Sequence, residues 1–179
     1  MKNIAIYPGS FDPFSNGHLD ILQRASRIFE EVIVLVSINP NKTYVFNADE
    51  RVAMIKKIID VKHLTNVTVE ASEELVTNFA IKKQATVMIR GIRNHNDMDA
   101  ELTLFQFNHV SAPTLETVLL FPEANNLFLS SSAIKELVIF GNSIKPYVPE
   151  CLEQEIYEKI SQRLDVKKYR DTSSDKLAI

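Results

Sequence analysis

The sequence predicts an α/β fold in which helices cover both faces of a parallel sheet. Short β-branched runs alternate along the chain with longer segments whose apolar residues recur at helical spacing. Alternation of this kind is typical of parallel sheets. The uninterrupted apolar run Val32–Val36 suits a strand that is buried on both sides. Together these observations indicate a Rossmann-like, doubly wound sheet of five parallel strands in a single domain with a C-terminal helix.

Each element of this sheet is predicted from a local pattern. Asn47 is a good N-cap residue, and Glu50 stands where it completes a capping box for the helix that follows. The expected strands are Ile4–Tyr7, Val32–Ile38, Val67–Glu70, Thr86–Ile89 and Glu116–Phe121. The apolar stripes of the first two helices are Leu19, Leu22, Ala25 and Phe29, then Val52, Ile55, Ile58 and Ile59, and further helices are expected at Leu75–Lys83, Met98–Val110 and Leu152–Leu164.

Composition limits the classes of protein to consider. The chain of 179 residues is long enough to close one core without disulfides or metals, and we expect one domain over residues 1–165 with a frayed polar tail over 166–179. A net charge of -3 argues against a general nucleic-acid-binding role. Cys151 is the one cysteine, so no intrachain disulfide can form, and we expect it to be partly buried. No signal peptide or membrane span is evident, which leads us to expect a cytosolic protein that binds no membrane.

The segment after the first strand is the first candidate for a ligand site. In doubly wound sheets, ligands bind beyond the carboxyl ends of the strands, where the strand order reverses. Here the chain passes through Gly9 and Ser10 to Gly17 and His18 before a helix begins. The spacing fits neither a dinucleotide fingerprint nor a P-loop, yet a helix N-terminus favours a phosphate group. His18 is badly placed there for a structural role, because the helix dipole disfavours its protonation unless an anion is near. We therefore interpret it as functional.

Other polar residues are expected at the same edge of the sheet. Ser130, Ser131 and Ser132 begin a second helix, where hydroxyl groups can cap the helix and bind phosphate oxygens. Lys42 follows the second strand, and Arg90 and Arg93 follow the fourth. Three cations facing two helix starts indicate a polyphosphate site.

Four segments, taken in order, resemble bacterial phosphopantetheine adenylyltransferases. They are Y-P-G-S-F-D-P at 7–13, S-N-G-H at 15–18, I-R-G-I-R at 89–93 and S-S-S-A-I-K-E at 130–136, within a similarity that runs from about Ile4 to Pro149. The resemblance implies that the chain transfers the adenylyl group of ATP to the 4′-phosphate of phosphopantetheine in coenzyme A synthesis. It also implies Mg²⁺ bound through ATP, a homohexamer in which residues 98–113 help to bury the contact, and feedback by coenzyme A.

The same resemblance implies roles for individual residues. His18 would stabilise the transition state at the α-phosphate, and Lys42 and Arg93 would supply further positive charge. The acceptor would contact Ser10, Lys42, Val76 and Arg90. The ATP site would be formed by Ser10, Phe11, His18, Gly91, Ile92, Arg93, Glu101, Asn126, Leu127, Phe128, Leu129, Ser130, Ser131 and Ser132.

The chain departs from the family pattern at several positions. Ser15 replaces the usual Thr of the T-x-G-H motif and keeps the hydroxyl group, and His109 stands where Arg is frequent. The stretch D-M-D-A-E at 97–101 replaces a common D-[FY]-E-Y-E and so lacks two aromatic rings near the adenine side. Residues 123–127 also differ from the usual segment.

The chemistry agrees with what the sequence contains. A phosphate monoester is already an anionic nucleophile near neutral pH, so in-line attack on the α-phosphate requires alignment and positive charge rather than a general base. No convincing Ser/His/Asp or Cys/His set is present, and no covalent intermediate is expected. We expect His63 and His95 to be surface residues, His109 to pack or lie in an interface, and Phe105, Phe107 and Phe121 to pack in the core.

Three alternatives remain open at this point. A nicotinamide- or nicotinate-mononucleotide adenylyltransferase, or a glycerol-phosphate cytidylyltransferase, would share the G-H pair. Ser15 in place of a His, the loop at 89–93 and the serine run favour the pantetheine enzyme. A nucleotide sensor without turnover would not need His18, and a nucleic-acid-binding or structural role fits the acidic balance poorly.

Replacing His18 with Ala should lower turnover far more than it lowers ATP affinity. Removal of one preorganised donor at developing charge costs on the order of 10²–10³ in rate. Steady-state kinetics and ATP titration calorimetry of the variant would separate the two effects. A loss of affinity of about tenfold at unchanged turnover would contradict the role given to His18.

Overall fold

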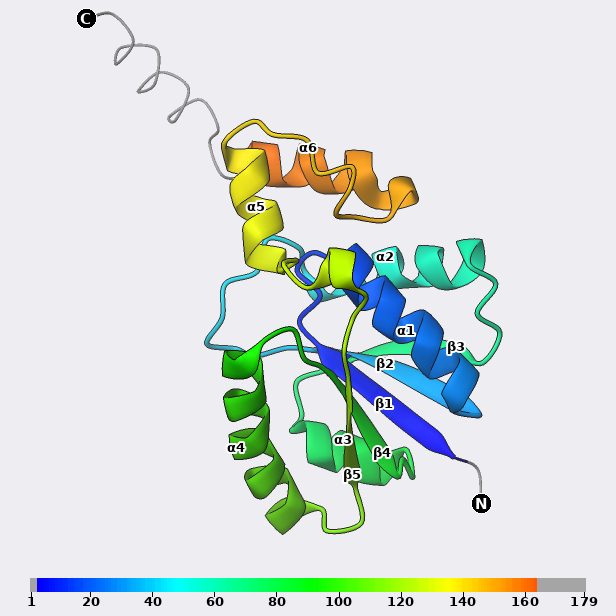
Figure 1. The fold of residues 1–179 in the computed structure, drawn as a ribbon. Helices are drawn as coiled ribbons and strands as arrows, with labels where there is room; N and C mark the ends of the chain where they lie inside the picture. The colour runs from blue at the N-terminus through cyan, green and yellow to red at the C-terminus, as the bar shows by residue number, and fades with distance from the viewer. Residues whose placement is uncertain (1–2, 164–179) are drawn as a thin grey trace, which may run out of the picture.

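The computed structural model describes residues 3–163, and within them five parallel strands form one sheet. The strands are β1 (Ile4–Gly9), β2 (Glu31–Ser37), β3 (Val67–Ser72), β4 (Val87–Gly91) and β5 (Glu116–Leu120). They lie in the order β3-β2-β1-β4-β5, which confirms the predicted doubly wound, Rossmann-like sheet (Figure 1). Both β1 and β4 run two residues further than predicted, because their last residues still pair with β2 and β5.

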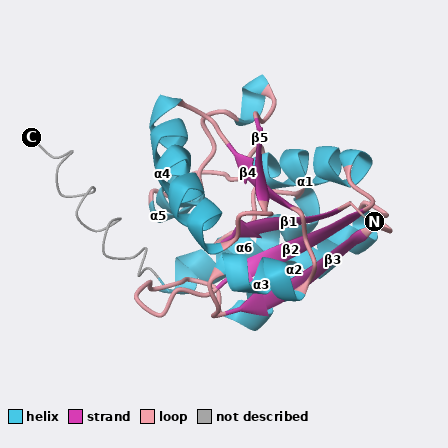
Figure 2. Cartoon of the chain, turned by 90° about the horizontal axis from the view of Figure 1, so that it is seen from below, coloured by secondary structure: helices cyan, strands magenta, loops and turns pink. Residues whose placement is uncertain are grey.

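Helices cover the two faces of the sheet unequally. The helices are α1 (Asn16–Ile28), α2 (Ala48–Val61), α3 (Val76–Lys82), α4 (His95–Ser111), α5 (Ser131–Ile139) and α6 (Glu153–Arg163), with short 3₁₀ turns at Ala124–Asn126 and Glu150–Leu152. Side chains of α1, α2, α5 and α6 share one core with Val32, Val34 and Val36 of β2. On the opposite face, Phe79 of α3 packs with Ile33 and other apolar residues. In Figure 1 the sheet lies between α1 and α2 on one side and α3 on the other, and Figure 2 views the same elements from below.

Helix α4 differs from the others because none of its side chains is buried. Apolar residues lie all around it, so several of them face outward: Leu102, Leu104, Phe107 and Val110 are exposed. The expectation that Phe107 and Phe121 pack in the core is therefore wrong, since they are 70% and 59% exposed. Phe105 is only partly buried and stacks on His109 at 5.5 Å between ring centroids.

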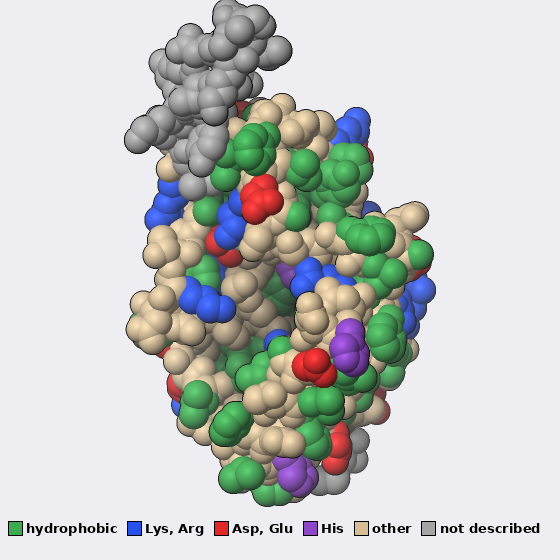
Figure 3. Space-filling view, turned by 60° about the vertical axis from the view of Figure 1, so that its left-hand side comes forward, with side chains coloured by type: hydrophobic (Ala, Val, Ile, Leu, Met, Phe, Trp, Pro, Cys, Tyr) green, Lys and Arg blue, Asp and Glu red, His purple; other side chains and the backbone are tan. Residues whose placement is uncertain are grey.

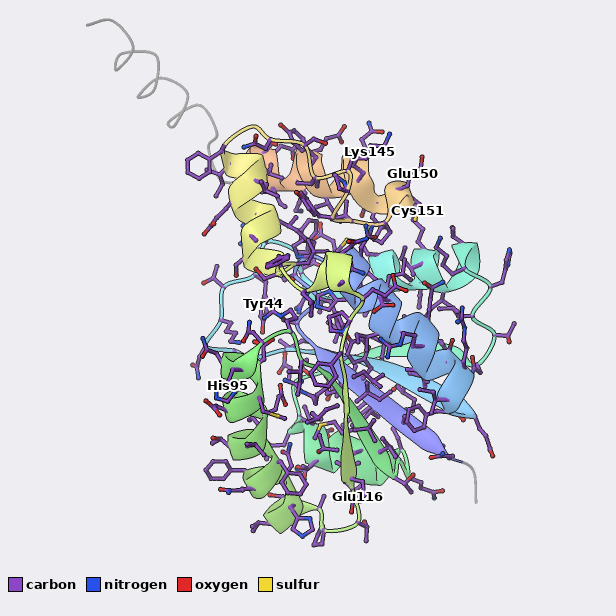
Figure 4. The ribbon with its side chains drawn as sticks, viewed as in Figure 1. Tyr44, His95, Glu116, Lys145, Glu150 and Cys151 are labelled. Carbon is purple, nitrogen blue, oxygen red and sulfur yellow. The ribbon has the colours of Figure 1, made fainter. Side chains whose placement is uncertain are left out.

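Local hydrogen bonds fix where the helices begin. Asn47 Oδ1 accepts from the N–H of Glu50 at 2.9 Å, and Glu50 Oε2 accepts from the N–H of Asn47 at 2.8 Å, which confirms the predicted capping box. The described part of the final helix reaches Arg163, and the predicted polar tail lies outside the described residues. Cys151 is partly buried, as expected, in the 3₁₀ turn Glu150–Leu152 that precedes α6 (Figure 4). Among residues 3–163, no helix combines the length and apolar character that crossing a membrane requires.

Candidate active site

A pocket of about 360 Å³ lies where the strand order reverses, between the carboxyl ends of β1 and β4. The connection from β1 leads towards β2 and the connection from β4 leads towards β5, so a crevice opens between them. Figure 3 looks onto a hollow in the surface that is bordered by basic side chains. The walls are Tyr7, Pro8, Gly9, Ser10, Phe11, Ser15, Gly17, His18, Ile21, Arg90, Gly91, Arg93, Asp97, Ala100, Glu101, Pro122, Asn126, Leu129, Ser130 and Ser131.

The turn after β1 forms the floor of this pocket. Phe11 has a positive φ of 48° and its ring is buried, edge-on to Tyr7 at 5.4 Å and to His18 at 5.1 Å between centroids. A Cβ atom at Gly9 would lie 2.8 Å from that ring, so only glycine leaves the ring in place. The Phe11 ring thus supports the backbone that a ligand would approach.

His18 has a structural role that its position in the sequence did not suggest. It is the third residue of α1, and its Nδ1 accepts from the N–H of Ser15 at 3.1 Å. In return, Ser15 Oγ accepts from the N–H of His18 at 3.3 Å, which completes a capping box. Since a backbone N–H can only donate, Nδ1 carries no proton in this arrangement. The neutral ring is therefore protonated on Nε2, which can donate a hydrogen bond from the pocket wall.

The electrostatic surroundings keep this imidazole neutral. Burial, and secondarily the positive charge of Arg93, lower the pKa of His18 from 6.5 to about 4. At neutral pH the ring is then a hydrogen-bond donor rather than a cation. The sequence-based expectation that protonation is disfavoured agrees with this direction, although burial rather than the helix dipole is the main cause.

Two arginines from the end of β4 face the pocket, and both are held by carboxylates of α4. Nε and Nη2 of Arg90 donate to Glu101 at 2.8 and 2.6 Å, while its Nη1 donates to the carbonyl of Pro8 at 3.2 Å. Arg93 repeats this pattern, because Nε and Nη2 donate to Asp97 at 2.9 and 3.1 Å. Each guanidinium has five N–H groups, so some remain available for a ligand.

Asp97 is a site residue that the sequence analysis passed over. Its hydrogen bonds with Arg93 hold the pKa of its carboxyl group below the ordinary value. Nη1 of Arg93 also donates to the carbonyl of Leu129 at 2.7 Å, which ties β4 to the segment before α5. The available signal was the spacing, because Asp97 lies four residues before Glu101 on the same face of α4 and four residues after Arg93, which precedes the helix.

The start of α5 forms another wall, but not all of its hydroxyl groups face a ligand. Ser130 Oγ accepts from the N–H of Ala133 at 3.0 Å and caps the helix. Ser131 Oγ donates to the carbonyl of Pro13 at 2.9 Å and so attaches α5 to the turn after β1. The predicted capping role of the serine run is confirmed for Ser130.

Some of the predicted ligand residues lie outside the pocket wall. Lys42 lies on the exposed segment between β2 and α2. Val76 begins α3 and packs against the apolar cluster of Phe79 and Ile33 on the α3 face of the sheet. Four residues expected at the ATP site also lie outside the pocket wall, and their roles stay predictions: Ile92, Leu127, Phe128 and Ser132. Ile92 is buried, and Phe128 is 90% exposed to solvent.

A buried polar network beneath the pocket was also not anticipated. Asp12 is 3% exposed, and its carboxylate accepts from the N–H groups of Val45 and Phe46 at 3.1 and 2.8 Å. Nζ of Lys135 lies 3.0 Å from Asp12 Oδ2. These contacts join segments far apart in the sequence, so no local pattern could have revealed them.

Arg51 forms the second part of this network. It is 1% exposed, its Nη1 donates to the carbonyl of Ser10 at 2.8 Å, and its guanidinium lies 4.1 Å from the ring centroid of Tyr44. Figure 4 shows Tyr44 below α5, on the segment that leads into α2. The spacing does give a signal for the burial of Arg51, since this residue precedes Ile55 by four positions on the buried stripe of α2.

Comparisons with known proteins find relatives that match most of the chain. A family model described as cytidylyltransferase-like matches residues 6–137. The phosphopantetheine adenylyltransferase of Clostridium kluyveri is 42% identical over 158 residues, which cover 88% of this chain and 95% of the relative. The enzyme of the same name from Proteus mirabilis is 40% identical over 163 residues, covering 91% of this chain and 100% of its own.

Solved structures show the same fold at lower sequence identity. A Vibrio parahaemolyticus protein described as a nicotinate-nucleotide adenylyltransferase matches with a TM-score of 0.67 and 20% identity, covering 91% of this chain and 97% of that one. A Plasmodium falciparum nicotinic acid mononucleotide adenylyltransferase matches with a TM-score of 0.65 and 19% identity, covering 90% and 96%. These likenesses establish the architecture and do not bear on the acceptor.

The environment of His18 predicts how it titrates. In the free protein we expect a pKa of about 4, below the ordinary 6.5. The unfolded chain then takes up the proton first, so the stability that His18 contributes is complete above about pH 6.5 and is lost as the pH falls towards 4. ATP phosphates beside the ring should raise the pKa, because they favour the imidazolium ion. NMR titration with and without Mg-ATP tests this, and an unperturbed pKa in the free protein would contradict the geometry.

Proposed function

This chain belongs to the phosphopantetheine adenylyltransferase family, and we propose that it transfers the adenylyl group of ATP to the 4′-phosphate of phosphopantetheine. The products are dephospho-coenzyme A and pyrophosphate. One observation carries the proposal beyond the family name: the pocket at the β1/β4 switch point combines a neutral His18 with the guanidinium groups of Arg90 and Arg93. That combination suits a polyphosphate undergoing attack at one phosphorus atom.

The transfer is a direct in-line displacement. An oxygen of the acceptor phosphate forms a bond to the α-phosphorus of ATP, and the bond from that phosphorus to the bridging oxygen of the β-phosphate breaks. Pyrophosphate leaves with the electron pair, and no proton has to be removed from the nucleophile. The protein therefore needs to align the two substrates and to stabilise negative charge on the α-phosphate oxygens.

Named residues can supply this stabilisation. His18 Nε2–H is fixed in direction because the other ring nitrogen is held by Ser15. Arg93 is held by Asp97 and by the carbonyl of Leu129, so its remaining N–H groups are oriented before any ligand arrives. Such preorganised donors require no rearrangement during the reaction.

We propose that Mg²⁺ enters with ATP rather than through a protein cage. Mg²⁺ is commonly held by substrate phosphates and water with few protein ligands. Within the described part of the chain, no group of three or more His, Cys, Asp or Glu side chains is placed to hold a metal ion. The carboxylates that line the pocket, Asp97 and Glu101, are engaged by arginines. When bound, the ion would neutralise phosphate charge and favour departure of pyrophosphate.

The acceptor would extend from the pocket towards Lys42 and Val76. The segment that carries Lys42 is attached to the turn after β1 through Asp12 and Arg51, which supports a role near the reacting groups. Leu75, next to Val76, is 70% exposed and could line the pantetheine arm. Coenzyme A, which contains both halves of the product, would bind at the same site as a feedback ligand. A cytosolic location belongs to this proposal, since ATP is abundant there.

We also propose that the chain forms a homohexamer. Helix α4 buries none of its side chains, although Leu102, Phe107 and Val110 are apolar and exposed. Exposed apolar surface of this kind commonly marks an interface with another protein chain. Figure 3 shows hydrophobic side chains at the surface of the face that holds the hollow.

Pyrophosphate release with Mg-ATP should identify the acceptor. Phosphopantetheine, nicotinate mononucleotide and glycerol 3-phosphate would be offered in parallel, and we expect release with phosphopantetheine alone. A His18→Gln control keeps a side chain suited to the capping box but removes the imidazole, so it should lose turnover without losing the helix start. Release with another acceptor would overturn the choice of substrate, while ATP binding without release would favour a nucleotide sensor.

Assembly can be tested by introducing a charge into α4. Val110 is 83% exposed, so Val110→Asp should leave the protomer folded and disrupt its self-association. The matched control is Val61→Asp on α2, where Val61 is 51% exposed. Light scattering should give about six times the protomer mass of 20.3 kDa for the unmodified chain and for the control. A monomeric unmodified chain would contradict the proposal.

A further inference from the structure

We propose that Asp12 is a positioning residue that keeps the nucleotide-side helix α5 and the acceptor-side segment 38–47 at a fixed separation, with Lys135 as its partner on α5. This inference rests on the proposed function. Asp12 is not part of the pocket wall, so it acts through the segments it holds and not by touching a substrate.

The contacts of the Asp12 carboxylate reach both sides of the pocket. On the acceptor side, it accepts from the N–H groups of Val45 and Phe46, three and four residues after Lys42. On the nucleotide side, it accepts from Nζ of Lys135. The carboxylate itself belongs to the turn that carries Ser10 and precedes His18.

Helix α5 is attached to this turn at two levels. Ser131 Oγ donates to the carbonyl of Pro13 at 2.9 Å, and Lys135, four residues later on the same face, reaches Asp12 at 3.0 Å. The side chain of Lys135 is 25% exposed and that of Asp12 is 4% exposed. Burial makes the carboxylate depend on all of its donors, since a buried charge that loses a partner is costly.

This arrangement has a consequence for catalysis. A nucleotide bound at the start of α5 would restrain that helix, and through Lys135 and Asp12 it would restrain the segment that carries Lys42. In-line transfer requires the two substrates to be held in close alignment, and a misplacement of about 1 Å can cost on the order of 10² in rate. Loss of the Lys135 contact should therefore affect turnover even though Lys135 lies outside the pocket wall.

The test compares three substitutions of lysine. Lys135→Met removes the ammonium group, Lys135→Arg retains a positive charge, and Lys159→Met is the matched control. Nζ of Lys159 donates to Glu50 at 2.6 Å, and its side chain is 37% exposed, so the control removes a similar ion pair between α6 and α2 away from the pocket. Each variant is assayed for kcat and KM with phosphopantetheine and Mg-ATP, and for thermal unfolding.

We expect Lys135→Met to lower kcat about tenfold or more, within the effect that misalignment can produce. Lys135→Arg should recover part of that loss. Lys159→Met should keep the kcat of the unmodified chain, and it should lose less thermal stability than Lys135→Met because Glu50 is 32% exposed whereas Asp12 is 4% exposed. A merely structural role for Lys135 would instead lower the unfolding temperature and leave kcat unchanged, which would overturn the proposal.

A second readout does not depend on turnover. Hydrogen exchange at the amides of Val45 and Phe46 should slow when Mg-ATP alone is added to the unmodified chain, and this slowing should vanish in Lys135→Met. Absence of slowing in the unmodified chain, or equal slowing in both proteins, would overturn the coupling. If the coupling is present but no acceptor supports pyrophosphate release, the proposed function fails, and only the coupling of α5 to segment 38–47 through Asp12 and Lys135 stands.

Discussion

The reversal of strand order between β1 and β4 is the constraint on which the site depends. These strands are parallel neighbours whose connections leave in opposite directions, so no connection covers the crevice between their carboxyl ends. The turn after β1, the end of β4 and the starts of α1 and α5 meet there. Two helix N-termini face one small volume there, so part of the positive potential of the pocket follows from topology, and the guanidinium groups of Arg90 and Arg93 add to it.

The charges in this pocket are balanced rather than accumulated. Each arginine is paired with a carboxylate of α4, and His18 in the same pocket is neutral. The carboxylates reduce the net positive charge, but they also fix the planes of the guanidinium groups. A site of this kind selects phosphate oxygens by their orientation more than it attracts anions in general. Orientation is what an in-line displacement needs from its surroundings.

Much of the fold could be predicted because its signals are local. Strand and helix patterns need only a few neighbouring residues, and the Asn47 cap and the Ser130 helix start were read correctly from such patterns. The Asp12–Lys135 pair could not be predicted, since it joins residues separated by 123 positions. The exposure of Phe107 was mispredicted because an apolar residue on a helix does not show by itself which surface covers it. The site was located by motif, while its internal contacts required the tertiary structure.

Helix α4 is attached to the site differently from the other long helices. It buries no side chain, and its polar links to the pocket are the ion pairs with Arg90 and Arg93. Apolar packing is little affected by salt, whereas ion pairs near a surface are screened over about 10 Å at an ionic strength of 0.1 M. In an isolated protomer, salt should therefore loosen α4 before it loosens α1 or α2. The ionic composition of the surroundings would thus set how firmly the arginines are aligned, independently of how firmly the core is folded.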